Sequence, residues 1–160
     1  MNDKVYIAFI KISELGDDKS LRGAILLTDL NYYPIEIRYT DVVNASTLEK
    51  IAYGINFKRG LAVDKIISPL IDALENIPNL ILIDDSQFLR AQNKTDIPVC
   101  QIDKEDQSNL KFNFAKNEKE YKDLTSNLLG ESIEYETIIE PFERLLKALE
   151  HVHFYGKSNL

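Results

Sequence analysis

Cysteine is almost absent from this sequence of 160 residues, and long apolar runs are absent altogether. The single Cys100 has no second cysteine with which to form an internal disulfide bond, which is typical of proteins from reducing compartments. No apolar stretch approaches the roughly 20 residues that a membrane-spanning helix needs. The first residues also lack the basic and then apolar layout of a secretory signal. We therefore expect a cytoplasmic protein with no membrane partner.

Several motifs with a known chemistry are also missing. The sequence has no glycine-rich phosphate loop, no zinc-ligand spacing and no nucleophile motif of the G-x-S-x-G type. The two histidines, His151 and His153, lie two apart on a predicted helix, so they face different ways and make a poor metal pair. Cys100 lies inside an apolar segment far from both histidines, and we interpret it as a buried hydrophobic residue rather than a nucleophile.

Positive charge is in deficit, since the net charge is −7. Binding to a nucleic-acid backbone depends on clustered Lys and Arg, so this charge does not favour a nucleic-acid partner, although it is compatible with a local basic patch. The apolar fraction of 44% and the charged fraction of 28% are those of an ordinary globular protein. The length predicts one domain over residues 1–160, with a core at about 4–103 and a C-terminal helical part at about 118–155.

Five segments are apolar and β-prone enough to be strands. They are residues 5–12, 22–28, 32–39, 80–83 and 97–102. Short connections predict an antiparallel meander for the first three. In the third, apolar residues at 35, 37 and 39 alternate with polar ones at 36, 38 and 40, so we expect the polar face to lie in water.

Helices are predicted between and after these strands. Ser46 and Glu49 form a capping box, which predicts a short helix ending near Gly54. Apolar residues recur at helical spacing over 66–74, where Pro69 either kinks one helix or begins a second one capped by Ser68. Two more helices are expected, at 118–129 and from about 138 to 152. The remaining segments 55–60, 86–96 and 103–117 are predicted to be loops or polar connections.

This order of elements predicts an α/β fold with a mixed sheet, in which a three-strand antiparallel meander is extended by two parallel strands and helices cover both faces. It matches the ribonuclease H-like architecture. The strand at 80–83 ends abruptly at Asp84 and Asp85. Ligands and metals gather at the carboxyl ends of such strands, so these two residues are the first candidates for chemistry. The alternative is a strand-ending turn, in which aspartate is common.

Three segments resemble the endonuclease V family, which shares its core with the C-terminal nuclease domain of the excision-repair protein UvrC. Residues 7–13, IAFIKIS, resemble the family's opening strand I-A-G-V-D-V-S. Residues 52–59, AYGINFKR, are similar to its Y-x-P-G-x-x-x-F-R-E element. Residues 66–84 resemble its helix followed by L-L-L-V-D-G, and the proline in 97–99 falls where the family has one. The resemblance covers roughly residues 5–103.

The resemblance implies a metal-dependent nuclease whose site has changed. In the family, three carboxylates hold a divalent metal, usually Mg²⁺, that activates water for phosphodiester cleavage. Asp84 matches one of them, whereas Lys11 stands at the first-strand aspartate, Gly60 at the glutamate and Asp85 at a glycine. An ammonium offers no oxygen ligand and adds positive charge, so Lys11 could replace the metal and pair with Asp84.

Other charged residues are weaker candidates. Asp64, near the lost glutamate, and Glu14 could supply metal ligands, as could Asp103 at a strand end, and Lys58 and Arg59 could contact phosphate. For each of them the alternative is an ordinary solvated side chain.

Three functional hypotheses follow. The first is an endonuclease V-like domain with lost or weakened catalysis that binds nucleic acid or protein. The second is an active endonuclease that uses Mg²⁺ or Mn²⁺ in a rearranged carboxylate cage built from Asp84, Asp85 and either Asp64 or Glu14. The third is an α/β interaction domain unrelated to nucleases, whose C-terminal helix docks a protein partner. A lysine within salt-bridge reach of Asp84 would favour the first hypothesis over the second.

Overall fold

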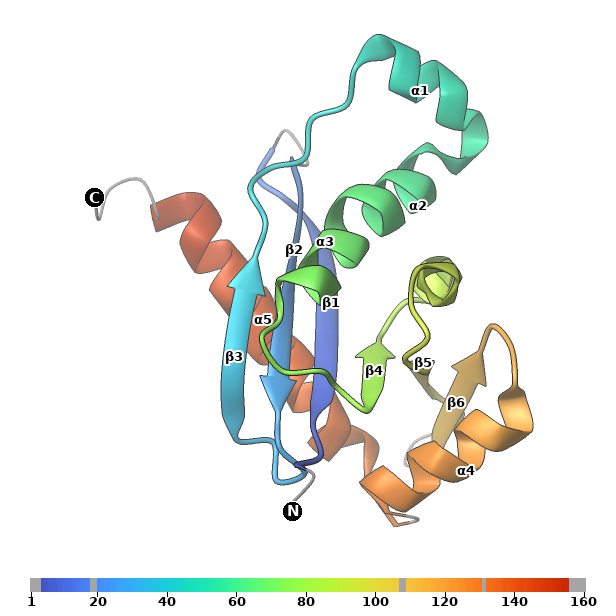
Figure 1. The fold of residues 1–160 in the computed structure, drawn as a ribbon. Coiled ribbons are helices and arrows are strands. Elements are labelled where there is room, and N and C mark those ends of the chain that lie inside the picture. The colour runs from blue at the N-terminus through green and yellow to red at the C-terminus, as the bar shows by residue number, and fades with distance from the viewer. Residues whose placement is uncertain (1–3, 18–19, 107–108, 131, 156–160) are drawn as a thin grey trace.

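The chain folds around one mixed β-sheet (Figure 1). The structure is a computed structural model that describes residues 4–17, 20–106, 109–130 and 132–155. Within this part of the chain the sheet has six strands in the order β3-β2-β1-β4-β5-β6. Their bounds are β1 (Ile7–Leu15), β2 (Ser20–Thr28), β3 (Pro34–Tyr39), β4 (Leu80–Ile83), β5 (Val99–Lys104) and β6 (Leu110–Phe114).

The strand directions confirm the predicted fold class. Strands β1, β2 and β3 form an antiparallel meander, β4 runs parallel to β1, and β5 runs parallel to β4. This is the ribonuclease H-like arrangement of a meander extended by two parallel strands. Strand β6 pairs antiparallel with β5 and lies in the segment 103–117, for which the prediction of a loop was wrong. That strand is short and only half-buried, so its sequence carries a weak apolar signal.

Helical segments cover both faces of the sheet (Figure 1). Their bounds are α1 (Thr47–Tyr53), η1 (Gly54–Asn56), α2 (Phe57–Ala62), η2 (Val63–Ile67), α3 (Ser68–Ala73), η3 (Ser86–Lys94), α4 (Glu118–Leu129) and α5 (Tyr135–Tyr155). We call the helical segment from α1 to α3 the arm. The sheet face under α2, η2, α3 and η3 is then the arm face, and the opposite one is the α5 face. Residues Ala8 and Ile10 of β1 pack on the arm face, while Ile7 and Phe9 pack on the α5 face. Burial on both faces explains why the central strands are almost wholly apolar.

The predicted C-terminal helix packs against the sheet. Its apolar stripe, including Phe142, Leu145 and Leu149, is buried on the α5 face, where the ring of Phe142 meets that of Phe9 at a centroid distance of 5.4 Å. Intramolecular packing therefore occupies the apolar stripe of this helix. Within the described residues, no helix is both long and apolar enough to cross a membrane.

The arm that leads from α1 to α3 is helical almost throughout. The capping box at Ser46 and Glu49 is present as predicted, with both reciprocal hydrogen bonds formed. Residues 55–60 are helical, so the prediction of a loop there was wrong. Before Pro69 the helix widens into the π-turn η2, and Pro69 then lies in the first turn of α3, without a side-chain cap from Ser68. The wider turn accommodates a residue that has no backbone N–H to donate.

The arm lies very close to the sheet at Gly23 of β2. A Cβ atom built on Gly23 would lie 2.1 Å from Cγ2 of Ile66, so only glycine fits there without movement. This contact sets the distance between η2 and the sheet that carries the candidate site.

The edge strand β3 reverses the predicted orientation. Its alternation is correct, but the apolar Ile37 and Tyr39 are 47% and 56% exposed, whereas Glu36 is only 9% exposed. Glu36 faces the turn after α3, where its carboxylate accepts hydrogen bonds from the backbone N–H groups of Glu75 and Asn76 at 2.9 Å. These donors satisfy the buried charge, which the pattern of polar and apolar residues could not reveal.

The connection after β4 is also more ordered than the sequence suggested. Residues 86–94 form the 3₁₀ segment η3 instead of an irregular polar link. Phe88 and Ala91 pack on the arm face, and the buried Gln92 accepts a hydrogen bond from the backbone N–H of Val99 at 2.7 Å. These contacts tie the segment that follows Asp84 to the start of β5.

Candidate functional site

Two candidate residues meet at the carboxyl ends of the central parallel strands. In the register of β1 and β4, Ile10 lies opposite Ile83. The next residue on each strand is Lys11 and Asp84, so the parallel pairing sets them side by side. The Lys11 Nζ atom donates a hydrogen bond to Asp84 Oδ2 at 2.7 Å.

This ion pair is partly buried. The side chain of Lys11 is 23% exposed and that of Asp84 is 18% exposed. Solvent and salt screen such a pair less than one at the open surface. The pair is also a charge-assisted hydrogen bond, which is stronger than a neutral one. The ammonium of Lys11 therefore neutralises the carboxylate that the sequence placed at the end of the strand.

The arrangement does not fit the metal that the family resemblance implies. A divalent cation needs several oxygen ligands, and here a lysine ammonium binds the one matching carboxylate. Among the described residues, no group of three or more Asp, Glu, His or Cys side chains is arranged to hold a metal ion. The residues present thus do not form a three-carboxylate cage around Asp84.

Asp85 caps the segment that follows the strand. Its Oδ1 atom accepts from the backbone N–H of Gln87 at 2.9 Å, and its Oδ2 accepts from the side-chain amide of the same residue at 3.2 Å. This is the N-cap of η3. The geometry matches the alternative reading of a strand-ending turn, in which the carboxylate satisfies local donors.

An aromatic ring lies against Gly60, the position where the family has its glutamate. A Cβ atom built on Gly60 would lie 2.6 Å from two carbon atoms of the Tyr53 ring, so a larger side chain would displace that ring. The hydroxyl of Tyr53 in turn donates a hydrogen bond to Asp64 Oδ2 at 2.7 Å. Glycine at 60 is therefore part of the local packing that holds Tyr53 against Asp64.

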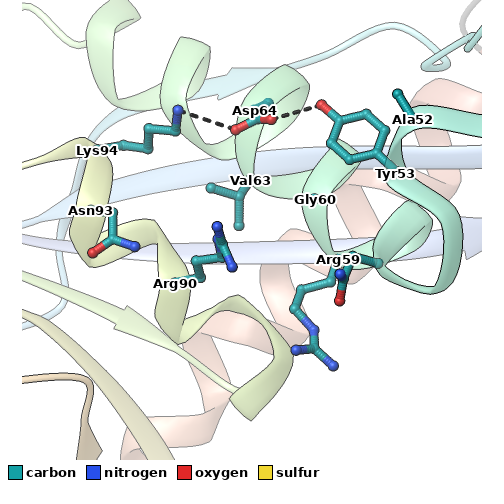
Figure 2. Close-up of a pocket in the computed structure, with 10 residues that line it drawn as sticks. Ala52, Tyr53, Arg59, Gly60, Val63, Asp64, Arg90, Asn93 and Lys94 are labelled. Atoms are coloured by element: carbon teal, nitrogen blue, oxygen red, sulfur yellow. Dashed lines mark hydrogen bonds and ion pairs between the residues drawn. The ribbon is translucent and has the colours of Figure 1, made fainter. Parts of the chain in front are cut away.

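Asp64 is bound by two partners from different elements (Figure 2). Tyr53 holds one oxygen, and Lys94 Nζ lies 3.3 Å from the other. The hydrogen bond from Tyr53 and the nearby cations Lys94 and Arg90 lower the pKa of Asp64, although burial opposes this. The same hydrogen bond raises the pKa of Tyr53 to about 12. At neutral pH the pair therefore consists of a carboxylate and a neutral phenol.

The remaining candidates lie in three other places. Glu14 at the end of β1 forms an ion pair with Lys58 of α2 at 2.5 Å, so a candidate metal ligand and a candidate phosphate contact bind each other. Arg59 instead lines a hollow of about 310 Å³ between the arm and η3, together with Asp64, Arg90 and other residues. Asp103 is an exposed residue of β5.

Apart from Asp85 and Asp103, the sequence-predicted residues are thus distributed over three small sites. Lys11 meets Asp84, Glu14 meets Lys58, and Asp64 and Arg59 share the hollow. Sequence reasoning missed Tyr53, Arg90 and Lys94, which complete the hollow. Arg90 and Lys94 lie in residues 86–94, which were predicted to be a polar connection, so the sequence offered no reason to place them beside Arg59 and Asp64.

Cys100 and the histidines have structural surroundings. Cys100 is fully buried, as predicted, and burial raises the pKa of its thiol. His153 Nδ1 lies 3.3 Å from Nη1 of Arg22, so it accepts a hydrogen bond from the guanidinium. The ring of His151 lies beside that of Tyr155, at a centroid distance of 5.7 Å.

Comparison with known proteins finds a distant structural similarity and no sequence match. No protein-family model and no curated protein sequence matches this chain. Among solved structures, the chain is similar to an Endonuclease V from Bacillus subtilis, with 16% sequence identity and a TM-score of 0.47. The match covers 61% of this chain and 44% of that one, so less than half of the solved chain is represented here. The fold assignment rests on the strand order and directions of this chain itself.

Proposed function

We propose that this chain is a ribonuclease H-like domain of endonuclease V type that no longer cleaves phosphodiester bonds and serves nucleic-acid processing by binding. The observation that carries the proposal is the hydrogen bond from Lys11 Nζ to Asp84 Oδ2 at 2.7 Å. A metal-dependent nuclease needs negative oxygen ligands at this place, because they hold the cation that activates water. Lysine supplies the opposite charge and no oxygen.

The second altered position supports the same proposal. The ring of Tyr53 lies where a side chain on residue 60 would project, so Gly60 cannot be replaced by glutamate without repacking the arm. The nearby carboxylate of Asp64 is hydrogen-bonded to Tyr53 and paired with Lys94. The two departures from the family pattern are thus built into the packing of the domain.

Metal binding tests the proposal directly. We expect calorimetric titration with Mn²⁺ to show no saturable site that depends on Asp84, so that the wild type and Asp84→Asn give the same weak heats. Lys11→Asp puts a second carboxylate beside Asp84 and should create a saturable Mn²⁺ site, because two adjacent carboxylates attract a divalent cation. The double variant Lys11→Asp, Asp84→Asn should lose that site, which controls for nonspecific binding.

Cleavage assays complete the test. Single-stranded and deaminated DNA and RNA should remain intact with the wild type in Mg²⁺ or Mn²⁺, at rates no higher than with Asp84→Asn. The proposal fails if the wild type binds Mn²⁺ at a site that Asp84→Asn abolishes, or if it cleaves any of these substrates in a manner that depends on Asp84. The Asp84→Asn protein, purified in parallel, excludes a contaminating nuclease as the source of any activity.

A further inference from the structure

A basic hollow lies on the arm face, separate from the Lys11–Asp84 pair. It has a volume of about 310 Å³, which is at the lower end of the size of small-ligand sites. The end of α1, the segments α2 and η2, and η3 form its walls (Figure 2). The side chains of Tyr53, Asn56, Arg59, Asp64, Arg90 and Lys94 are among those that line it.

The charge of this hollow is opposite to that of the whole protein. Of its described lining residues, Arg59, Arg90 and Lys94 are basic and only Asp64 is acidic, whereas the chain as a whole carries −7. The basic residues come from segments about thirty residues apart in the sequence, which the fold brings together. At physiological salt the charges on distant surfaces are largely screened within about 8 Å, so an anion in the hollow responds mainly to these local cations.

Two of the cations are available for a ligand. Lys94 is paired with Asp64 at 3.3 Å, but within the described part of the chain neither Arg59 nor Arg90 makes an ion pair or a side-chain hydrogen bond. Both arginines are exposed at the hollow (Figure 2). A guanidinium presents several N–H donors in a planar fork that matches the oxygen atoms of a phosphate group.

Asp64 lies in a fixed position within the hollow. Its carboxylate is bound by the hydroxyl of Tyr53 and by Lys94, and Lys94 and Arg90 help to keep its pKa below the usual value. The hollow therefore keeps a net positive charge, while the carboxylate of Asp64 offsets part of the repulsion between the basic side chains. The side chains of Asn56 and Asn93 add neutral groups that can donate hydrogen bonds.

We propose that this hollow binds a phosphate monoester, with Arg59 and Arg90 as its principal donors and Lys94 beside them. The phosphate can belong to a free mononucleotide or to the 5′ end of an oligonucleotide, and the hollow has room for the phosphate and the sugar next to it. The inference deepens the proposed function by naming the group that is bound. It does not depend on the Lys11–Asp84 pair, which lies at another site.

Calorimetric titration of the full chain with adenosine monophosphate at low ionic strength tests the site. We expect saturable binding that adenosine does not show, because the phosphate supplies the negative charge. Arg59→Gln and Arg90→Gln should each weaken binding about tenfold, which is the effect of losing a charge-assisted hydrogen bond. Lys122→Gln, an exposed residue of α4 that makes the same change in net charge, should leave the affinity unchanged.

A variant with the opposite sign strengthens the test. Asp64→Asn keeps an acceptor for Tyr53 but removes the negative charge, so it should tighten phosphate binding about threefold. Oligonucleotides with and without a 5′ phosphate then separate the two sources, since preference for the phosphorylated end over free nucleotide would identify a nucleic-acid terminus.

The proposal is overturned if adenosine monophosphate shows no saturable binding, if adenosine binds equally well, or if Lys122→Gln weakens binding as much as the two arginine variants do. Thermal unfolding of each variant should match the wild type, because both arginines are exposed. If adenosine monophosphate does not bind and the wild type also cleaves no substrate, the phosphate site is refuted and the proposed absence of cleavage still holds. Cleavage that depends on Asp84, with phosphate binding intact, would refute the proposed function alone.

Discussion

The Lys11–Asp84 pair should contribute measurably to folding stability, and a double-mutant cycle can isolate its contribution. The perturbations are Lys11→Met, which keeps most of the aliphatic stem, and Asp84→Asn, which keeps the shape of the side chain. Each single variant leaves one partner without its counter-charge in a partly buried place, since the side chains are 23% and 18% exposed. The double variant removes both charges together and should recover part of the loss.

The expected magnitude follows from the geometry. At 2.7 Å and an effective dielectric constant of about 20, the direct attraction is about 6 kcal/mol. Removing the two charged groups partly from water offsets most of this attraction. We therefore expect a coupling free energy of about 1–2 kcal/mol, which is within the range for groups in direct contact.

Urea unfolding followed by circular dichroism provides the assay. The pair of Lys65 and Glu49 serves as a matched control, because its side chains are more exposed, at 37% and 34%, and exposed ion pairs contribute little to stability. Its cycle, with Lys65→Met and Glu49→Gln, should give the smaller coupling. A coupling for Lys11 and Asp84 that is no larger than that of the control would refute the claim that the lysine neutralises the strand-end carboxylate.

Three further predictions concern the edge strand, the arm and the hollow. Burial opposes the ionisation of Glu36, but hydrogen bonds from two backbone N–H groups and from Asn76 outweigh burial and lower the pKa of Glu36. The ionised carboxylate therefore stabilises the fold fully above its unfolded-state pKa, and this stabilisation is lost as the pH falls through the folded-state pKa. The midpoint of urea unfolding should accordingly decline less on acidification in Glu36→Gln than in the wild type. Gly23→Ala should reduce the free energy of unfolding by about 1–3 kcal/mol because its Cβ would overlap Ile66, and thermal unfolding of Gly23→Ala, Ile66→Ala should show a smaller loss than the sum of the single variants. Phosphate binding in the hollow should be the same with and without EDTA, because protein cations hold the anion, and a loss of affinity in EDTA would instead indicate a bound metal.

The positions of the five core strands along the chain were predictable from the sequence because these strands have strong local signals. Segments such as 80–83 are apolar throughout and bounded by turn residues, and buried parallel strands require this composition. The capping box at Ser46 and Glu49 was equally clear, since it depends only on local hydrogen bonds. These features are decided within a few residues of chain.

The missed elements depend on contacts that lie far apart in the sequence. Strand β6 is held by its pairing with β5, and residues 86–94 become helical because Phe88 and Ala91 reach the arm face. The orientation of β3 was wrong because Glu36 finds its hydrogen-bond donors about forty residues later, after α3. Sequence periodicity shows that two faces differ, but it does not show where a buried carboxylate finds its partners.

The residues of the candidate site also fall into those that the sequence indicated and those that depend on long-range contacts. The family resemblance raised the pairing of Lys11 with Asp84, because it places both residues at the metal site, and the structure shows the hydrogen bond between them at 2.7 Å. The sequence named Arg59 and Asp64 as separate candidates but did not predict the hollow that they share, because Arg90 and Lys94 lie in a segment whose helical structure was not predicted. A site assembled from the end of a helix and a separate 3₁₀ segment leaves no fixed spacing in the sequence.

The residues at positions 11 and 60 both make the local charge more positive than in the family pattern. A metal site gathers negative side chains around a cation, and a phosphate site gathers positive side chains around an anion. The resemblance to the endonuclease V family places Lys11 at the position of one carboxylate and Gly60 at the position of a second. The arginine beside it remains, and the arm and η3 bring further cations to the same wall. Under the proposed function, both positions therefore disfavour a bound metal and favour a bound anion.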